Sequence, residues 1–432
     1  MDLTSKILTE NEQSDIPHSA AGPAVLRVGI AIGILALTVR LALLWLTRSY
    51  LSPDPSEVVA IATALAKTGH FADAYGALTG PTAHASPLYP YLLSMVYRLF
   101  GTGVRGEIAQ EILSCALASG VWALMPSIAV VCRIGKTVGV LAGTAGALLP
   151  INRAPETKGD FETAATGLMC ALVFLTYVRC LRTHPPSAKG ALLLGTISGV
   201  AILTSASLAA VICGLLALVP FVVDRRLGAI RLVFPITAAL TILVVLSPWA
   251  IRNYLTLGSL VWTRSNFGIE LNVSNNDLAV PNWGDNTVAM ERYHPRANVT
   301  ERRELMAYGE IKYNRQKRTQ ASQWISDHPR AFLGLTLRRV FYFWFPKMKR
   351  PIQVIAFAAI TLGAFIGVTL LYGRDPILAI TFIAMGITYP LVYYIVQASS
   401  RYVYPLQWML VFLSSYFLWR TVRARRGSGL QA

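Results

Sequence analysis

The apolar run VLRVGIAIGILALTVRLALLWL occupies residues 25–46 of the chain. A helix needs about 20 predominantly apolar residues to cross the hydrocarbon core of a bilayer, and this run has that length. The chain of 432 residues is 54% hydrophobic and only 14% charged, whereas about 25% of the residues in a soluble domain are charged. The sequence therefore predicts an all-α polytopic membrane protein.

Nine further apolar runs follow, and with the first they predict about ten transmembrane helices. They lie near residues 107–132, 136–152, 161–181, 188–204, 206–223, 229–250, 351–372, 376–396 and 402–420. Two long polar segments, 48–106 and 252–350, interrupt them. The expected organisation is a tail (1–24), a transmembrane core that includes the first polar segment (25–251), an outer loop or cap (252–350), and C-terminal helices with a basic tail (351–432).

The distribution of basic residues predicts the orientation in the membrane. If the N-terminus lies inside the cell, the short loops 133–136, 179–189 and 224–231 are cytoplasmic, and these loops are rich in Lys and Arg. Short cytoplasmic loops of membrane proteins have this composition. Counting 86–100 as a further span would place the same loops outside. We therefore expect both termini in the cytoplasm, both polar segments on the outer face, and 87–100 as a helix in the membrane interface.

Several classes of function are disfavoured by the sequence. A net charge of +17 would suggest nucleic-acid binding in a soluble protein. Here the basic residues gather in the short loops that are expected to be cytoplasmic, so no nucleic-acid partner is expected. The five cysteines lie in or beside apolar runs, so neither a disulfide framework nor a cysteine-ligated metal is expected. The absence of a Walker loop and of an HExxH motif argues against a nucleotide-driven pump and a zinc protease.

The polar segments show patterns of helices and loops. In the first, apolar residues between Glu57 and Gly69 and again between Ser86 and Phe100 recur at helical spacing, which predicts two amphipathic helices half sunk in the membrane surface. In the second, the Asn- and Gly-rich stretch Phe267–Asn286 predicts a loop. Residues 300–328 are expected to be helical, and Pro329–Phe345 is expected to form a basic, aromatic helix in the interface.

An acidic motif, Ser52-Pro53-Asp54-Pro55-Ser56-Glu57, follows the first apolar run. Asp at an N-cap, Pro at the first helical position and Glu two positions later form a strong helix-start pattern. A carboxylate held at such a place can also act as a general base toward an acceptor hydroxyl. The capping interpretation and the catalytic interpretation of Asp54 are compatible.

A second acidic cluster, Glu156, Asp160 and Glu162, is expected on the same face as Asp54. Glu162 directly precedes an apolar run, where a carboxylate is costly unless it has a function; the alternative is an ordinary interfacial acid at a helix N-terminus. Which of the three residues matters is left open. Asp54 and Glu162 would be the ligands of a divalent cation, Mg²⁺ or Mn²⁺, if the protein uses one; no other cofactor is expected.

Basic residues on the outer face are candidates for binding a phosphate. Arg401 lies in a short outer loop, and His84, Arg252 and Arg264 lie in the polar segments. Arginine binds phosphate groups with its planar fork of donors, although each residue alone has the simpler interpretation of a surface charge. Arg40, inside the first apolar run, is either a functional intramembrane residue or a side chain that reaches the interface.

The order of several motifs resembles that of the GT-C membrane glycosyltransferases, specifically the group of protein O-mannosyltransferases and aminoarabinose transferases. The motifs are Pro53-Asp54-Pro55-Ser56-Glu57, Ser86-Pro87-Leu88-Tyr89-Pro90, Pro248-Trp249…Arg252-Asn253-Tyr254, Trp324-Ile325…His328-Pro329 and Arg401-Tyr402…Pro405. The resemblance covers most of the chain. It departs from the family at Ser86 and at Thr204-Ser205, where some members have lysine, so the identity of the donor stays open.

The resemblance implies a GT-C-like bundle with two outer loops in a bacterial inner membrane, with an active site that faces the periplasm. It implies transfer of a sugar from a polyprenyl-phosphate donor to a lipid, glycan or protein acceptor, with inversion at the anomeric carbon. Asp54 matches the catalytic base, and Glu162, Asp160 or Glu156 matches the second acidic site. The resemblance implies that Glu57, His84, Tyr89, Arg252, Asn253 and Arg401 bind the substrate. A transporter or flippase of a lipid-linked saccharide is the alternative, followed by an inactive scaffold.

Overall fold

The computed structural model describes residues 22–53, 56–76, 78–159, 161–183 and 185–428. The helices are α1 (Pro23–Thr47), α2 (Glu57–Thr68), α3 (Leu88–Phe100), α4 (Val104–Ala123), α5 (Met125–Val131), α6 (Lys136–Leu148), α7 (Arg153–Thr157), α8 (Thr163–Arg182), α9 (Ala188–Thr204), α10 (Leu208–Val222), α11 (Ile230–Leu257), α12 (Phe267–Ser274), α13 (Thr287–Tyr293), α14 (Val299–Tyr308), α15 (Glu310–Asp327), α16 (Pro329–Trp344), α17 (Pro351–Tyr372), α18 (Pro376–Thr388), α19 (Leu391–Ile395) and α20 (Ser400–Ser428). Within these residues only two isolated bridges represent β-structure. The predicted all-α fold is confirmed.

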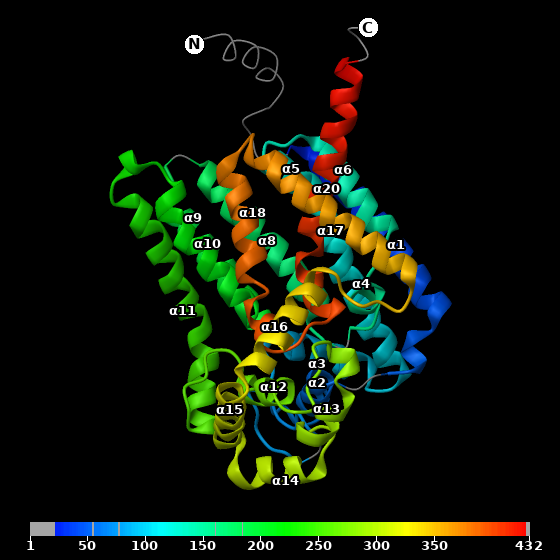
Figure 1. Ribbon diagram of the computed structural model, residues 1–432, viewed down its shortest axis with the longest axis vertical. Coiled ribbons are helices and arrows are strands. Elements are labelled where there is room, and N and C mark those ends of the chain that lie inside the picture. Colours follow the sequence, from blue (N-terminus) through cyan, green and yellow to red (C-terminus); the bar gives the residue numbers. More distant parts are fainter. Residues whose placement is uncertain (1–21, 54–55, 77, 160, 184, 429–432) are drawn as a thin grey trace.

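The apolar helices lie side by side in one half of the molecule, the bundle (Figure 1). By length and composition, six helical stretches of the described residues can cross a membrane: α1, α4 with α5, α8, α11, α17, and α18 with α19. The shorter apolar helices α9 and α10, together with α6 and α20, pack among them. All ten apolar runs of the sequence are therefore helical, and the multi-pass membrane fold is confirmed. The count of ten crossings stays a prediction.

Helix α20 reaches the centre of the bundle because glycines on α17 allow a close approach. A Cβ atom at Gly367 would lie 2.1 Å from the carbonyl oxygen of Leu413, and one at Gly363 would lie 2.5 Å from Ser414 Oγ. Real side chains cannot occupy such positions, so these two residues set the separation of α17 and α20. This packing holds the start of α20, which carries Arg401, at one end of the bundle.

The opposite half of the molecule is a cap, formed by α2 and α3 from the first polar segment and by α12–α15 from the second (Figure 1). The apolar side chains Val58, Ile61 and Leu65 of α2 are buried in a cluster with residues of α12, α14 and α15. The expectation that α2 lies half sunk in the membrane is therefore wrong. Its apolar face finds protein partners that lie more than 200 residues later in the chain. Helix α3 instead keeps Leu92, Met95 and Leu99 exposed, as expected of an interfacial helix.

The second polar segment is more ordered than its composition predicts. The stretch expected to be loop contains α12, whose Ile269 and Val273 are buried in the cap. Gly268 allows this helix to contact α15, since a Cβ there would lie 1.9 Å from the carbonyl oxygen of Asn314. Tertiary packing therefore stabilises a helix in a sequence that reads locally as a loop. The predicted helices in 300–328 and from Pro329 are present as α14, α15 and α16.

Candidate active site between the bundle and the cap

A cavity of about 460 Å³ lies where the cap meets the bundle. Its volume falls in the range of about 300–1,000 Å³ that is usual for small-molecule sites. Segments far apart in the sequence contribute its walls. The polar side chains among the lining residues are Glu57, His84, Glu162, Thr163, Thr166, Ser205, Ser207, Thr263, Arg264, Asn266, Glu270, His294, Arg296, Tyr389, Tyr393, Arg401 and Tyr402.

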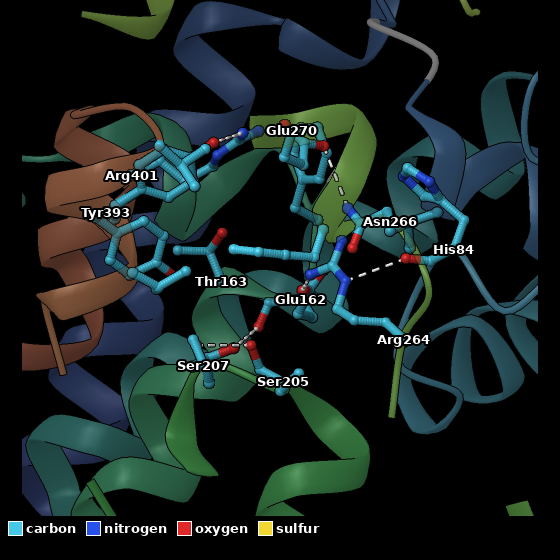
Figure 2. Close-up of a pocket in the computed structure, with 18 of the residues that line it drawn as sticks. His84, Glu162, Thr163, Ser205, Ser207, Arg264, Asn266, Glu270, Tyr393 and Arg401 are labelled. Carbon is cyan, nitrogen blue, oxygen red and sulfur yellow. Dashed lines mark hydrogen bonds and ion pairs between the residues drawn. The ribbon is translucent and has the colours of Figure 1, made fainter. Parts of the chain in front are cut away.

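The two ends of the cavity differ in chemistry. The cap and the loops beside it contribute charged side chains, and Figure 2 shows Arg264 reaching toward Glu162 across the centre. The bundle contributes hydroxyl groups, including Ser205 and Ser207 with their oxygens 3.0 Å apart. It also contributes a small apolar wall, Ala209, Ala210, Val392 and Val396. The cavity therefore offers charged, hydroxyl and apolar groups together, which suits an amphiphilic ligand that carries charge and hydroxyl groups beside an apolar part.

The segment that carries His84 is held in place by the cap. Glu310 of α15 accepts hydrogen bonds from the hydroxyl of Thr82 and from the backbone N–H of Ala83, the latter at 2.8 Å. Ser265 Oγ donates to the same carboxylate at 2.5 Å. One buried carboxylate thus joins two stretches that line the cavity, the stretch before His84 and the stretch that follows Arg264.

Arg252 also holds the first polar segment. Its guanidinium donates to the carbonyl oxygens of Thr82 at 2.7 Å and Phe71 at 2.8 Å, and it lies over the ring of Trp249. Arg252 does not line the cavity. Its hydrogen bonds hold the loop that carries His84, so Arg252 positions this loop without contacting the cavity.

The protonation of two side chains follows from their surroundings. Burial lowers the pKa of His84 to about 3, so its imidazole is neutral at neutral pH, with Nδ1 2.7 Å from the Tyr75 hydroxyl. Burial also raises the pKa of the Glu57 carboxyl, but the neighbouring His294 and Arg296 outweigh burial and hold that pKa below its usual range. Glu57 is therefore a carboxylate at neutral pH.

The ion pairs in the cavity are long. Arg264 Nη1 lies 3.5 Å from Glu162 Oε1, and Arg296 Nη1 lies 3.7 Å from Glu57 Oε2. Charge-assisted hydrogen bonds between nitrogen and oxygen are about 2.7–2.9 Å long, and the ion pair buried between α1 and α7 measures 2.9 Å. The two carboxylates therefore lie near cations without forming short hydrogen bonds to them. Their oxygens can still accept hydrogen bonds from the hydroxyl groups of a ligand.

Arg401 is surrounded by aromatic rings. Its guanidinium carbon lies 3.8 Å from the ring centroid of Phe161 and 4.8 Å from that of Trp283, and its Nη2 donates to the Tyr402 hydroxyl at 3.0 Å. Trp283 is itself fixed by a backbone hydrogen bond to Ala398 at 2.9 Å. Within the described part of the chain, no carboxylate forms an ion pair with Arg401. A cation that lies over aromatic rings and forms no ion pair with a described carboxylate is suited to binding an anionic group.

Arg40 and Glu156 lie away from the cavity and bind each other. Their side chains are 0% exposed, with Nη2 2.9 Å from Oε1, and Arg40 also donates to the carbonyl oxygen of Gly146 at 3.0 Å. Arg40 therefore does not reach the interface. Of the acidic residues between the third and fourth apolar runs, Glu162 lines the cavity and Glu156 does not. Asp160, like Asp54, lies outside the described residues.

Two further residues matched by the family resemblance contact the backbone. Tyr89 donates its hydroxyl to the carbonyl oxygen of Gly159 at 2.8 Å, and Asn253 donates to that of Val261 at 2.8 Å. Neither lines the cavity, and their substrate-binding role stays a prediction.

The expected divalent cation has only one of its two expected ligands, Glu162, among the described residues. Glu162 is paired with Arg264. No group of three or more His, Cys, Asp and Glu side chains with suitable geometry occurs in the part of the chain that the structure describes. The described residues by themselves therefore supply no metal site, and the reaction proposed below is written without a metal ion.

Several cavity residues were not singled out from the sequence. His294, Arg296, Asn266, Glu270 and Trp283 come from the second polar segment, where no regular spacing marks them. Only the concentration of charged and aromatic residues beside asparagines in this segment hints at a site. The tertiary structure brings them together around Glu57 and Arg401.

No family model and no curated protein matches the sequence. Solved structures do match. The archaeal oligosaccharyltransferase AglB from Archaeoglobus fulgidus, in complex with an inhibitory peptide and a dolichol-phosphate, superposes with a TM-score of 0.55 at 11% identity, covering 95% of this chain and 52% of that chain. The same enzyme tethered to an acceptor peptide that contains the NVT sequon gives 0.55 at 12% identity, covering 91% and 49%.

A third structure of that oligosaccharyltransferase, in complex with Zn and sulfate, gives a TM-score of 0.52 at 12% identity, covering 90% of this chain and 48% of that chain. The present chain thus spans about half the length of the proteins it matches. At this identity the likeness concerns the fold. The GT-C-like fold expected from the order of the motifs is confirmed.

Proposed function

We propose that this protein is an integral-membrane glycosyltransferase that moves a sugar from a polyprenyl-phosphate donor to a hydroxyl group of a lipid, glycan or protein. The observation that carries this proposal is the composition of the cavity between bundle and cap that is described above. It combines a cation without an ion pair to any described carboxylate, Arg401, with carboxylates in long ion pairs, Glu57 and Glu162, and a small apolar wall from the bundle. A lipid-linked sugar phosphate carries the complementary groups in one molecule: an anionic phosphate, sugar hydroxyls and an apolar chain.

On the donor side, the apolar wall contacts the first isoprenoid units, and Arg401 binds the phosphate. The hydroxyls of Ser205, Ser207 and Tyr393 exchange hydrogen bonds with the sugar hydroxyls, and the carboxylate of Glu162 accepts hydrogen bonds from them. Because Arg401 is stacked against Phe161 and Trp283, its orientation is set before the donor binds. Preorganised charge of this kind stabilises a leaving group without reorganisation during the reaction.

On the acceptor side, Asp54 takes the proton of the acceptor hydroxyl while the oxygen attacks the anomeric carbon. The bond between that carbon and the phosphate oxygen breaks, its electron pair leaves with the phosphate, and the configuration inverts. Glu57, three residues after Asp54 in the sequence, lines the cavity and binds the acceptor or the sugar. We place this site on the periplasmic face of a bacterial inner membrane, with both chain termini in the cytoplasm.

The AglB structure of the same fold holds a dolichol-phosphate and an inhibitory peptide. We extend the lipid phosphate, and an acceptor that enters from outside the membrane, to this chain as part of the proposal. A flippase or transporter of a lipid-linked saccharide would also need an amphiphilic cavity, but it would leave the bond between sugar and phosphate intact.

Transfer can be separated from transport in nanodiscs, which have no closed compartment. The purified protein is incubated there with a panel of radiolabelled polyprenyl-phosphate sugars and an extract of envelope lipids and glycans as acceptors. We expect release of free polyprenyl phosphate with one sugar and the appearance of its label on an acceptor. Binding of a donor without release of lipid phosphate for any sugar would refute the enzyme and favour the transporter.

Substitution of Arg401 by methionine is expected to lower the transfer rate roughly 10²- to 10³-fold, the usual effect of removing one preorganised charge-stabilising donor. Methionine fills the space between the rings but cannot bind phosphate. Lysine should also be impaired, since it keeps the charge and loses the planar, stacked fork. Initial rates of lipid-phosphate release measure both.

The matched control for Arg401 is Arg303→Met on α14, because Arg303 is exposed and does not line the cavity. It should keep the rate of the unmodified protein. An Arg401→Met protein that is folded and transfers sugar at a normal rate would remove Arg401 from the phosphate site.

A further inference from the structure

Helix α16 lies at the junction of bundle and cap (Figure 1), and one of its faces carries an exposed apolar stripe. Leu333, Leu337 and Phe341 are 57%, 62% and 58% exposed, and they recur every four residues along one face. Two exposed arginines lie on the same helix: Arg330 precedes Leu333 by three residues and shares the face of the stripe, and Arg338 flanks it. A helix with an apolar stripe beside cations is typical of a membrane interface.

The charge of this region is of one sign. Residues 328–350 contain the six cations Arg330, Arg338, Arg339, Lys347, Lys349 and Arg350, and no Asp or Glu. Lys347 pairs with Asp285 at 2.8 Å, and Arg339 is buried.

Arg330, Arg338, Lys349 and Arg350 remain exposed, and in the described ranges of the chain none of them forms an ion pair. The nearest acidic residue in the sequence, Asp327, accepts both amide hydrogen bonds of Gln323 at 3.1 Å. Four exposed cations therefore face outward without a counter-charge from the protein.

The position of these cations relative to the bilayer follows from the next helix. Helix α17 begins at Pro351 and is long and apolar enough to cross a membrane, and its first turns expose Ile352 and Ile355. Lys349 and Arg350 thus lie where this helix enters the bilayer, at the depth of the lipid headgroups. Headgroups with net negative charge attract Lys and Arg at this depth, whereas zwitterionic headgroups provide no net attraction.

We propose that α16 and the segment Pro346–Arg350 form a binding surface for anionic phospholipids of the adjoining leaflet. The stripe of Leu333, Leu337 and Phe341 inserts among the acyl chains. The four exposed cations bind headgroup phosphates. This surface is separate from the cavity and does not depend on the proposed glycosyltransferase activity.

The opposite side of α16 connects this surface to the cavity wall. Arg339 donates to Asn275 Oδ1 at 3.1 Å and to the carbonyl oxygen of Ile395 at 3.0 Å. Asn275 directly follows α12, and Ile395 ends α19, and both helices carry cavity residues. Of two consecutive arginines, Arg338 thus faces the lipid and Arg339 fixes the helix to the site.

A fluorescent probe on α16 tests the proposal. Position 334 is suitable because a Cβ atom at Gly334 would meet nothing within 4 Å. In a Cys213→Ser background, which removes the exposed free cysteine of the described chain, Gly334→Cys is labelled with bimane. The labelled full-length protein is reconstituted in phosphatidylcholine vesicles that contain about one fifth brominated phosphatidylglycerol or, in a parallel sample, brominated phosphatidylcholine.

We expect brominated phosphatidylglycerol to quench the probe about twofold more than brominated phosphatidylcholine, and high salt to reduce the difference. The substitutions Arg330→Gln and Arg338→Gln together should remove most of the difference in quenching between the two brominated lipids. The control pair Arg303→Gln and Arg318→Gln removes the same charge from exposed positions on α14 and α15 and should leave the difference intact.

Equal quenching by the two lipids in the protein without charge substitutions overturns the proposal, and this comparison needs no variant that might fold poorly. Quenching by neither lipid overturns it as well, since α16 would then not contact the bilayer. A preference that persists after the Arg330 and Arg338 substitutions shows that other residues bind the lipid. None of these readouts uses sugar transfer, so their outcome is independent of the proposed reaction.

Discussion

Replacement of Asp54 by asparagine is expected to lower the rate of sugar transfer about 10²- to 10⁴-fold, the range that a positioned general base contributes. The amide keeps the size of the side chain but cannot accept the proton of the acceptor hydroxyl. The effect should appear in kcat, with little change in the KM for the donor, because the proton is transferred only in the reacting complex. Initial rates of polyprenyl-phosphate release at saturating donor measure it.

The same polar segment offers a matched control, Asp73→Asn. Asp73 Oδ1 accepts the backbone N–H of Gly80 at 3.0 Å, and an asparagine oxygen can accept it equally well. The backbone φ of Asp73 is 63°, a left-handed conformation that asparagine tolerates. Asp73 does not line the cavity, so this variant should be fully active. A folded Asp54→Asn protein with the same activity as Asp73→Asn would assign the base to another residue.

Replacement of Arg40 by methionine is expected to destabilise the protein by about 3–5 kcal/mol, the cost of leaving one member of a buried ion pair uncompensated. Glu156 would remain 0% exposed without its cation. The carbonyl oxygens of Gly146 and Ala147 at the end of α6 would lose their donor as well. The midpoint of unfolding by sodium dodecyl sulfate in mixed micelles measures the loss.

The double substitution Arg40→Met with Glu156→Met should recover most of this stability, because no unpaired charge remains. Arg40 Nε and Glu156 Oε2 lack a hydrogen-bond partner, so the native pair is not fully satisfied and an apolar replacement is tolerated. For comparison, Arg182→Met breaks a pair whose side chains are 30% and 24% exposed, and it should cost about 1 kcal/mol or less. If the double variant lost as much free energy of unfolding as the two single variants lose together, the unpaired charge would not be the cause of their instability.

The motif residues that supported the family resemblance divide into two groups in the structure. Glu57, His84, Glu162 and Arg401 line the cavity. Arg252 and Tyr89 instead bind backbone carbonyl groups. A motif in one sequence does not distinguish these roles, because binding a substrate and holding the loop that binds it both require polar residues at fixed places.

The choice between Glu156 and Glu162 shows the same limit. Both follow the third apolar run and lie before or at the start of the fourth, so the sequence does not separate their roles. The difference arises because Glu156 meets Arg40, which lies 116 residues earlier, while Glu162 meets Arg264, which lies 102 residues later. Only the packing of α1 against α6 and α7 decides which carboxylate stays in the cavity.

The sequence by itself determined the apolar helices, the exposed faces of α3 and α16, and the GT-C-like order of the elements. These properties depend on hydrophobicity summed over one helix length and on short motifs, both of which are local. Only the tertiary structure decided that α2 is buried, that α12 is a helix, and that Arg401 stacks between Phe161 and Trp283. Each of these depends on partners that are distant in the sequence, 45 residues away for the contact of α12 with Asn314 and more than 100 for Arg401 with its rings. The free energy of such contacts is not encoded in the periodicity of any single segment.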